Sequence, residues 1–190
     1  RELRLATPFS NGFLAIDTQN TLLRFKEGET EFEIVSANTA EGEAQSAVNF
    51  VQYGERIYVL TPLKNQIFRH QVILDKDLGP ATPWLSEASD IASAVSISVD
   101  STVWLAEPTR LRHFDRGTEI SLDLSSIDPP LLNLRDIWTS TDHNFIYLLD
   151  IGLGRVVVLQ KDNLAFIRQY TQDAFKTATS ISVDAKTELL

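Results

Sequence analysis

The pentapeptide Ser-Ile-Ser-Val-Asp occurs twice in this chain, at residues 96–100 and 180–184. It belongs to a longer series of turn-forming residues at intervals of 42, 46, 42 and 42 residues: Gly12, Gly54, Asp100, Asp142 and Asp184. Self-similarity at a fixed period is a signature of repeat architecture, and about 42 residues is the size of a four-stranded β-propeller blade. The sequence therefore predicts an all-β fold built from propeller blades.

Short apolar runs recur at similar offsets after each turn. The first run after the turn covers residues 13–17, 57–61, 103–106 and 145–150, and the second covers 22–25, 67–70, 111–114 and 156–159. Such runs, rich in β-branched and aromatic residues and bounded by Asn, Gly, Asp or Pro, favour strands. A strand before the turn is expected at 47–51, 94–99 and 179–183, and an outer strand at 32–35, 119–124 and 165–170. The best helical candidate, 162–175, fits an outer strand followed by a loop almost as well.

The period predicts one propeller region, residues 1–190, with four complete blades and part of a fifth. The expected boundaries are 1–41, 42–89, 90–130 and 131–174, with a partial blade at 175–190. Residues 187–190 align with 103–106, so we expect the chain to stop inside a strand of a six-bladed ring. An open arc would expose blade edges unless the missing residues are supplied. The alternative is a closed four-bladed ring of hemopexin type, although the linking disulfide and short helical blade ends of that ring are absent from the sequence.

Composition excludes several classes of function. The formal net charge of −9 repels a polyanion and argues against nucleic-acid binding. The chain has no cysteine, which excludes disulfides and thiolate zinc ligands. It also has no run of 18 apolar residues that could span a membrane. We expect no cofactor, and a protein or peptide as the partner.

Carboxylates end the second strand in two of the units. Asp17 and Asp150 hold this position in the first and fourth units, and Thr61 and Glu107 hold or neighbour it in the others. In a propeller these residues lie near one rim, where loops carry function. Rim carboxylates can bind calcium, but no unit has the spacing of a dedicated calcium loop. We therefore expect local bonds to backbone N–H groups, and keep Asp17, Glu107, Asp150 and Arg155 as candidate rim contacts.

Aromatic residues offer a second candidate surface. Trp84 lies in the stretch that makes the second unit four residues longer, so a contact with a ligand is conceivable there. We favour packing in the core or as a latch over binding at Trp84, and keep it as a candidate contact. Trp104 and Tyr147 occupy equivalent places on the second strand, where we expect them to pack between blades.

Two further patterns do not predict catalysis. His70 and His113 fall one position apart on the third strands of adjacent units, hence on opposite faces, and His143 falls in a turn; no metal site is expected, because ligands must gather at one place. Gly152 and Gly154 precede a strand, whereas a dinucleotide-binding loop needs a third glycine and a helix. We expect both glycines to adopt positive φ in a hairpin loop.

The fourth unit carries the clearest resemblance to a known family. Its segments 136–138, 147–150, 154–162 and 167–170 resemble a blade of the NHL or TolB-like type, which has an aspartate after the second strand and an arginine entering the third. Segments 103–105, 114–117, 147–150 and 169–170 also look like the propeller tails of predicted bacterial PP2C-type phosphatases. That resemblance implies a regulatory or recognition module, with a catalytic domain before residue 1.

Two functional hypotheses follow from these patterns. The leading one is a non-catalytic binding, scaffold or sensor module, because the repeat is regular and no catalytic set converges. The alternative is a lactonase-like or hydrolase-like six-bladed enzyme with an axial calcium ion. It requires Asp, Glu or Asn side chains from several blades to meet at one end of the axis.

Overall fold

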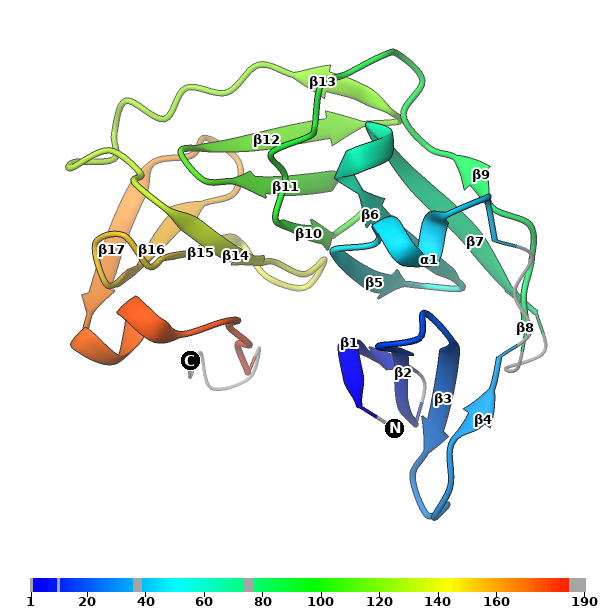
Figure 1. The fold of residues 1–190 in the computed structure, drawn as a ribbon. Helices are drawn as coiled ribbons and strands as arrows, with labels where there is room; N and C mark the ends of the chain where they lie inside the picture. Colours follow the sequence, from blue (N-terminus) through cyan, green and yellow to red (C-terminus); the bar gives the residue numbers. More distant parts are fainter. Residues whose placement is uncertain (1, 10, 36–38, 74–76, 185–190) are drawn as a thin grey trace. The chain divides into compact units, whose positions relative to one another are not determined.

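The computed structural model describes residues 2–9, 11–35, 39–73 and 77–184. These residues form two compact units, residues 1–92 and 93–190, which we describe separately. Each unit contains two antiparallel sheets, and within each sheet four strands follow one another in chain order (Figure 1). The prediction of an all-β fold with four strands per blade is confirmed for four blades.

The first blade holds β1 (Leu3–Phe9), β2 (Gly12–Asp17), β3 (Leu22–Lys26) and β4 (Glu33–Ile34). The sequence predicted the last three strands but missed β1. Glycine is required at the start of β2, because a Cβ at Gly12 would lie 1.9 Å from the carbonyl oxygen of Phe25 on β3. The close approach of these two strands therefore explains the first glycine of the repeat.

The second blade holds β5 (Asn49–Tyr53), β6 (Arg56–Thr61), β7 (Gln66–Ile73) and β8 (Asp77–Leu78), and β9 (Thr82–Pro83) also pairs with β7. Two short helices that the sequence did not predict flank these strands, α1 (Glu43–Ser46) and η1 (Pro62–Lys64). The apolar faces of the two blades share one core, which includes Leu14 and Ile16 of β2 with Phe50 of β5 and Val59 of β6.

The second unit contains the third and fourth blades. Their strands are β10 (Ser96–Val99), β11 (Val103–Glu107), β12 (Arg110–Asp115) and β13 (Thr118–Ile120), followed by β14 (Leu134–Trp138), β15 (Phe145–Asp150), β16 (Arg155–Gln160) and β17 (Phe166–Thr171). Trp104 and Leu111 of the third blade pack against Ile146, Leu148 and Val157 of the fourth. The predicted packing of Trp104 between blades is confirmed.

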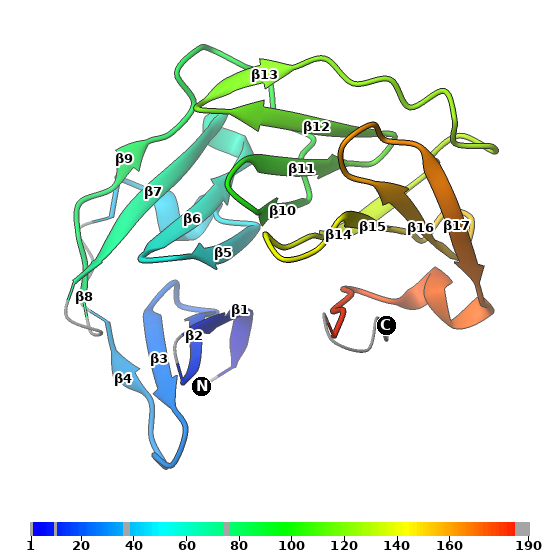
Figure 2. The ribbon, with the colours of Figure 1, turned by 180° about the vertical axis from the view of Figure 1, so that it is seen from behind.

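The chain after β17 departs from the prediction of a strand at 179–183. A 3-10 helix, η2 (Asp173–Thr177), follows β17, and residues 178–183 belong to no strand (Figure 2). Val183 is buried against Tyr147 and Leu149 of β15, so this segment covers one face of the fourth blade. A strand needs a partner, and the predicted partner at 187–190 lies outside the described residues, as does most of the predicted partial fifth blade after Asp184.

Two smaller predictions were wrong. The outer strand of the third blade ends at Ile120 instead of Leu124, because Leu122 and Leu124 turn inward and pack against the core of the second unit. Gly154 has the expected positive φ of 62°, but Gly152 does not belong to the residues with positive φ. A Cβ at Gly152 would lie 2.9 Å from the side chain of Leu132, so close packing explains this glycine.

Candidate functional site

The strand-end aspartates hold the loops around them. Asp17 Oδ1 accepts hydrogen bonds from the backbone N–H groups of Gln19 at 2.9 Å and Thr21 at 2.8 Å. Asp150 Oδ1 accepts one from the N–H of Asn133 at 2.9 Å, and its Oδ2 lies 3.1 Å from Nε of Arg155. Both carboxylates are buried, and both bond backbone N–H groups as the sequence led us to expect.

Arg155 is a buried clamp between the fourth blade and the loop before it. Its Nη2 donates to the carbonyl oxygens of Pro129 at 2.6 Å and Pro130 at 3.1 Å, and its Nη1 donates to Gln169 Oε1 at 2.9 Å. With the bond to Asp150, every nitrogen of this guanidinium donates to the protein. Arg155 thus has a structural role, because it joins the fourth blade to the loop at Pro129 and Pro130.

Glu107, the strand-end residue of the third blade, is shared by two arginines. Its Oε2 lies 2.6 Å from Nε of Arg110, and its Oε1 lies 3.0 Å from Nη1 of Arg112. Burial opposes ionisation of Glu107, but hydrogen bonds from Arg110, Ser93 and Arg112 outweigh it and lower the pKa of the carboxyl. Arg112 also pairs with Glu119 of β13. Glu107 is therefore ionised and committed to its neighbours.

The aromatic candidates pack inside the blades. Trp84 is half-buried, and its indole lies edge-on to Tyr58 with ring centroids 6.1 Å apart. The backbone N–H of Trp84 donates to the carbonyl of Ile67 at 2.8 Å, which latches this segment to β7. Trp104 stacks on His113 at 3.7 Å between ring centroids, and Tyr147 is fully buried.

The three histidines occupy two strands and a turn, as the sequence predicted. Burial lowers the pKa of His113 below its ordinary value. His143 lies before β15, with its ring centroid 5.4 Å from that of Trp138. His70 lies in the other unit. Across the described part of the chain, no three His, Cys, Asp or Glu side chains are placed to hold a metal ion.

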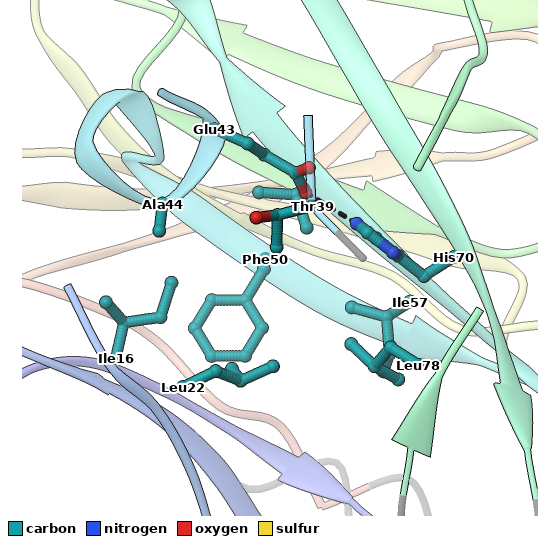
Figure 3. A pocket seen from close by; sticks show the side chains of 10 residues that line it. Ile16, Leu22, Thr39, Glu43, Ala44, Phe50, Ile57, His70 and Leu78 are labelled. Carbon is teal, nitrogen blue, oxygen red and sulfur yellow. Dashed lines mark hydrogen bonds and ion pairs between the residues drawn. The ribbon is translucent and has the colours of Figure 1, made fainter. Parts of the chain in front are cut away.

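A buried acid–base pair in the first unit was not found from the sequence. Figure 3 shows Glu43 of α1 pointing toward His70 of β7 above an apolar cavity. His70 Nε2 lies 2.6 Å from Glu43 Oε1, and His70 Nδ1 lies 2.8 Å from the carbonyl oxygen of Gly79. The other carboxylate oxygen of Glu43 accepts the N–H of Ala40 at 2.8 Å. Only 1% of the His70 side chain and 2% of the Glu43 side chain are exposed.

The partners of His70 determine its charge. A carbonyl oxygen and a carboxylate are both acceptors, so the ring satisfies both bonds only when both nitrogens carry a proton. Burial opposes this charge, but the hydrogen bonds to Glu43 and Gly79 outweigh it and raise the pKa of His70. The space beneath the pair is about 30 Å³, enough for a water molecule or two. Among the described residues, the site is thus an internal ion pair beside a small apolar cavity.

Asp136, on the first strand of the fourth blade, is another buried carboxylate. Its Oδ1 accepts hydrogen bonds from the hydroxyl of Ser96 on β10 at 2.5 Å and from the backbone N–H of Ile137 at 2.9 Å. Its Oδ2 accepts the N–H of Ile181 at 2.9 Å. Burial raises the pKa of Asp136, and these three donors offset only part of that effect. The carboxylate ties together the third blade, the fourth blade and the segment after η2.

A groove lies on the outer edge of the third blade. It has a volume of about 520 Å³ and runs along β12, β13 and the segment after β13. Its lining residues are Arg110, Leu111, Arg112, Glu119, Ile120, Ser121, Leu122 and Leu124. We call it the edge groove. The sequence did not indicate it, because it arises where β13 ends earlier than predicted.

Comparison with solved structures decides the fold. The chain is similar to virginiamycin B lyase from Staphylococcus aureus, with a TM-score of 0.59 and 13% identity over 90% of this chain and 56% of that one. It is also similar to a candidate 6-phosphogluconolactonase from Bacteroides uniformis, with a TM-score of 0.55 and 17% identity over 86% and 51%. The WD40 propeller domain of Doa1 matches with a TM-score of 0.58 and 8% identity over 90% and 69%. The fold is a β-propeller.

These similarities concern the fold alone, because the sequence identities are low. The propellers that they match include a lyase, a candidate lactonase and a WD40 domain, so the fold does not select a function. The chain spans about half the length of the first two. No family model matches the sequence. No curated protein matches it either.

Among the described residues, no helix has the length and apolar character needed to cross a bilayer.

Proposed function

We propose that this propeller is a non-catalytic binding or scaffold module with a protein or peptide partner. The observation that carries the proposal is that three buried carboxylates pair with cationic side chains of the protein itself. Glu43 is committed to His70, Glu107 to two arginines, and Asp150 to Arg155. A general acid, base or nucleophile must reach a substrate atom. These carboxylates are buried and bonded to the protein, so they are not placed to do so.

Other features support a binding role. The cavity beside His70 holds about 30 Å³, whereas the edge groove is open and holds about 520 Å³. A surface groove of that size suits part of a peptide better than a reacting small molecule, which active sites usually enclose. We propose that Asp17, Glu107, Asp150 and Arg155 act by holding the rim loops in shape, and that Trp84 offers contact surface.

We further propose that the four blades belong to a six-bladed ring of the NHL or TolB type. Their boundaries would lie near residues 41, 89, 130 and 174, with a fifth blade beginning near 175. The ring would form the propeller tail of a larger bacterial protein related to PP2C-type phosphatases. The half-length coverage of virginiamycin B lyase supports a larger ring. The complete coding sequence tests this proposal: two more repeats of about 42 residues would support it, and their absence would refute it.

Affinity capture with the complete protein tests the binding role. We expect a captured protein or peptide that, once purified, binds the complete protein directly and reversibly without being altered. Mass spectrometry of the partner after long incubation checks that no bond has been made or broken. Turnover of a substrate by the propeller region, purified with its ring complete, would overturn the proposal.

The rival proposal is a lactonase-like enzyme with an axial calcium ion, and one observation favours keeping it. Asp136 is a buried carboxylate on a first strand, the kind of residue that could contribute oxygen ligands. Both of its oxygens already accept hydrogen bonds. Bound calcium would raise the melting temperature of the complete protein by mass action. An unchanged melting temperature in millimolar calcium, compared with a chelator, would count against the rival.

A further inference from the structure

The edge groove lies beside a stretch of strand that has no outer partner. β12 has six residues, Arg110–Asp115, but β13 pairs only with the last three of them. In the described residues, no pairing continues β13 beyond Ile120. The first half of β12, residues 110–112, pairs with β11 but with no outer strand, and it forms one side of the groove.

The fourth blade shows what normally fills this place. Its third strand, β16, pairs with β17 along almost its whole length, from Arg155 opposite Thr171 to Leu159 opposite Phe166. The hairpins of the two blades close at equivalent pairs, Glu107 with Arg110 and Asp150 with Arg155. Residues 110–112 of the third blade thus correspond to 155–157 of the fourth, whose partners are 169–171. Three residues of outer strand are missing from the third blade.

Within this stretch, Leu111 directs its backbone groups into the groove. Glu107 and Arg110 close a two-residue hairpin, so Arg110 and Arg112 direct their backbone N–H and C=O groups toward β11. Leu111, between them, directs its own N–H and C=O away from β11, to the side of the groove. In the fourth blade the equivalent residue, Val156, faces Tyr170. An edge with outward N–H and C=O groups is a template for a further strand.

The two sides of the groove differ in character. Side chains alternate along a strand, so Arg110 and Arg112 lie on one face of the blade and Leu111 on the other. Ile120 is paired with His113 and shares the face of Leu111, and it is 41% exposed. The Arg110 side chain is 56% exposed, and only its Nε donates to Glu107. The groove therefore offers an exposed cationic group on one face and an apolar surface on the other.

We propose that the edge groove binds an extended peptide of a partner protein as an added β-strand, antiparallel to β12. This proposal rests on the proposed binding function and names its site. The residue opposite Leu111 takes the place that Tyr170 has in the fourth blade, and its apolar side chain covers Ile120. The next residue takes the place of Thr171 and carries a carboxylate that pairs with Arg110. Backbone bonds supply affinity and the two side chains supply specificity, as in other strand additions.

A random peptide library tests the proposal, because it samples extended sequences of every side-chain chemistry. Phage-displayed octapeptides are selected on the complete protein, and the enriched peptides are synthesised and titrated by fluorescence anisotropy. We expect an apolar residue followed directly by Asp or Glu. Ser121→Trp fills the groove from an exposed position and should weaken binding at least about tenfold, a loss of about 1.4 kcal/mol. Ser125→Trp lies in the same segment but outside the groove and should leave binding unchanged.

Two further measurements separate docking from misfolding. Arg110→Gln should weaken acidic peptides about tenfold while the melting temperature changes little, because Glu107 keeps its bond to Arg112. Hydrogen exchange at the amide of Leu111 should slow when the peptide is bound. The proposal is overturned if no peptide is enriched, or if enriched peptides bind the Ser121→Trp variant normally and leave the Leu111 amide unprotected. In the second case a partner site exists elsewhere, and the binding function survives. The binding function itself fails if the complete protein captures no partner, or if the propeller region turns over a substrate.

Discussion

Truncating Glu43 to alanine is expected to destabilise the first unit by about 3–5 kcal/mol, the cost of leaving one member of a buried ion pair without its partner. His70 would keep its bond to the carbonyl of Gly79 but lose the carboxylate at 2.6 Å. Both side chains are almost completely buried, so the unpaired His70 would be shielded from bulk water. Ala40 would also lose the acceptor of its N–H.

Glu43→Gln is the matched control for Glu43→Ala. The amide of glutamine can donate to a neutral His70, whose other nitrogen still donates to Gly79, so the bond survives without charge. We expect a loss of about 1–2 kcal/mol, the difference between a charged and a neutral hydrogen bond. The difference in the free energy of unfolding between the alanine and glutamine variants measures the cost of leaving His70 buried without a side-chain partner.

The pair also predicts a dependence of stability on pH. The pKa of His70 is raised in the folded protein above its unfolded value of about 6.5. Its stabilising contribution is therefore complete below about pH 6.5 and is lost as the pH rises through the folded pKa. Between the unfolded and the folded pKa of His70, the free energy of unfolding falls by up to about 1.4 kcal/mol per pH unit. Glu43→Gln should remove this slope, because it removes the charge that holds the second proton.

Urea unfolding from pH 5.5 to 9 measures the slope, and nitrogen NMR of the histidine rings measures the cause. The chain has three histidines, so assignment by substitution is simple. His70 should remain an imidazolium above pH 6.5, whereas His113, whose pKa is lowered by burial, should lose its proton below that value. A neutral His70 at pH 6, or a loss below about 1 kcal/mol in Glu43→Ala, would refute the reasoning.

Three further predictions follow from the blades. Gly12→Ala should destabilise the first unit by about 1–3 kcal/mol, since its Cβ would overlap the carbonyl oxygen of Phe25, and a thermal melt like that of the wild type would contradict this. Lys161→Met should make the protein less stable, because the ion pair with Lys161 helps to lower the pKa of Asp100 although burial raises it. In urea titrations the wild type should lose the stability that this ion pair supplies as the pH falls below about 4. An equal loss of stability in the variant would count against this role of Lys161. The pKa of Asp136 is raised in the folded state, so the wild type should lose stability as the pH rises above about 4 and this carboxyl gives up its proton. Asp136→Asn should reduce that loss. An unchanged dependence of stability on pH in the same assay would exclude this role of Asp136.

The repeat made most of the fold predictable because each strand has its own short apolar run. The starts of the third strands were predicted to within one residue, since Leu22, Ile67, Leu111 and Val156 recur at similar offsets from a turn. The strand β1 was missed because no turn residue precedes it in the series. The strand at 179–183 was predicted from the pentapeptide alone, although a strand also requires a neighbour to pair with.

The candidate sites were less predictable because they depend on contacts between separate segments. Glu43 lies 27 residues before His70, on a one-turn helix that no periodic pattern indicates. Asp136 was visible in principle: it is 40 residues after Ser96, and the two face equivalent positions of β15 and β11. A comparison of equivalent positions between units would have identified that contact, whereas the edge groove depends on where β13 ends.

The binding function is tested most directly by assaying the propeller region, purified with its ring complete, for hydrolysis of lactones and esters, with and without millimolar calcium. The account predicts rates equal to those of buffer, and equal rates for the wild type and Asp136→Ala. Calcium-dependent turnover by the wild type that disappears in Asp136→Ala, while that variant remains folded, would contradict it and establish the enzymatic alternative.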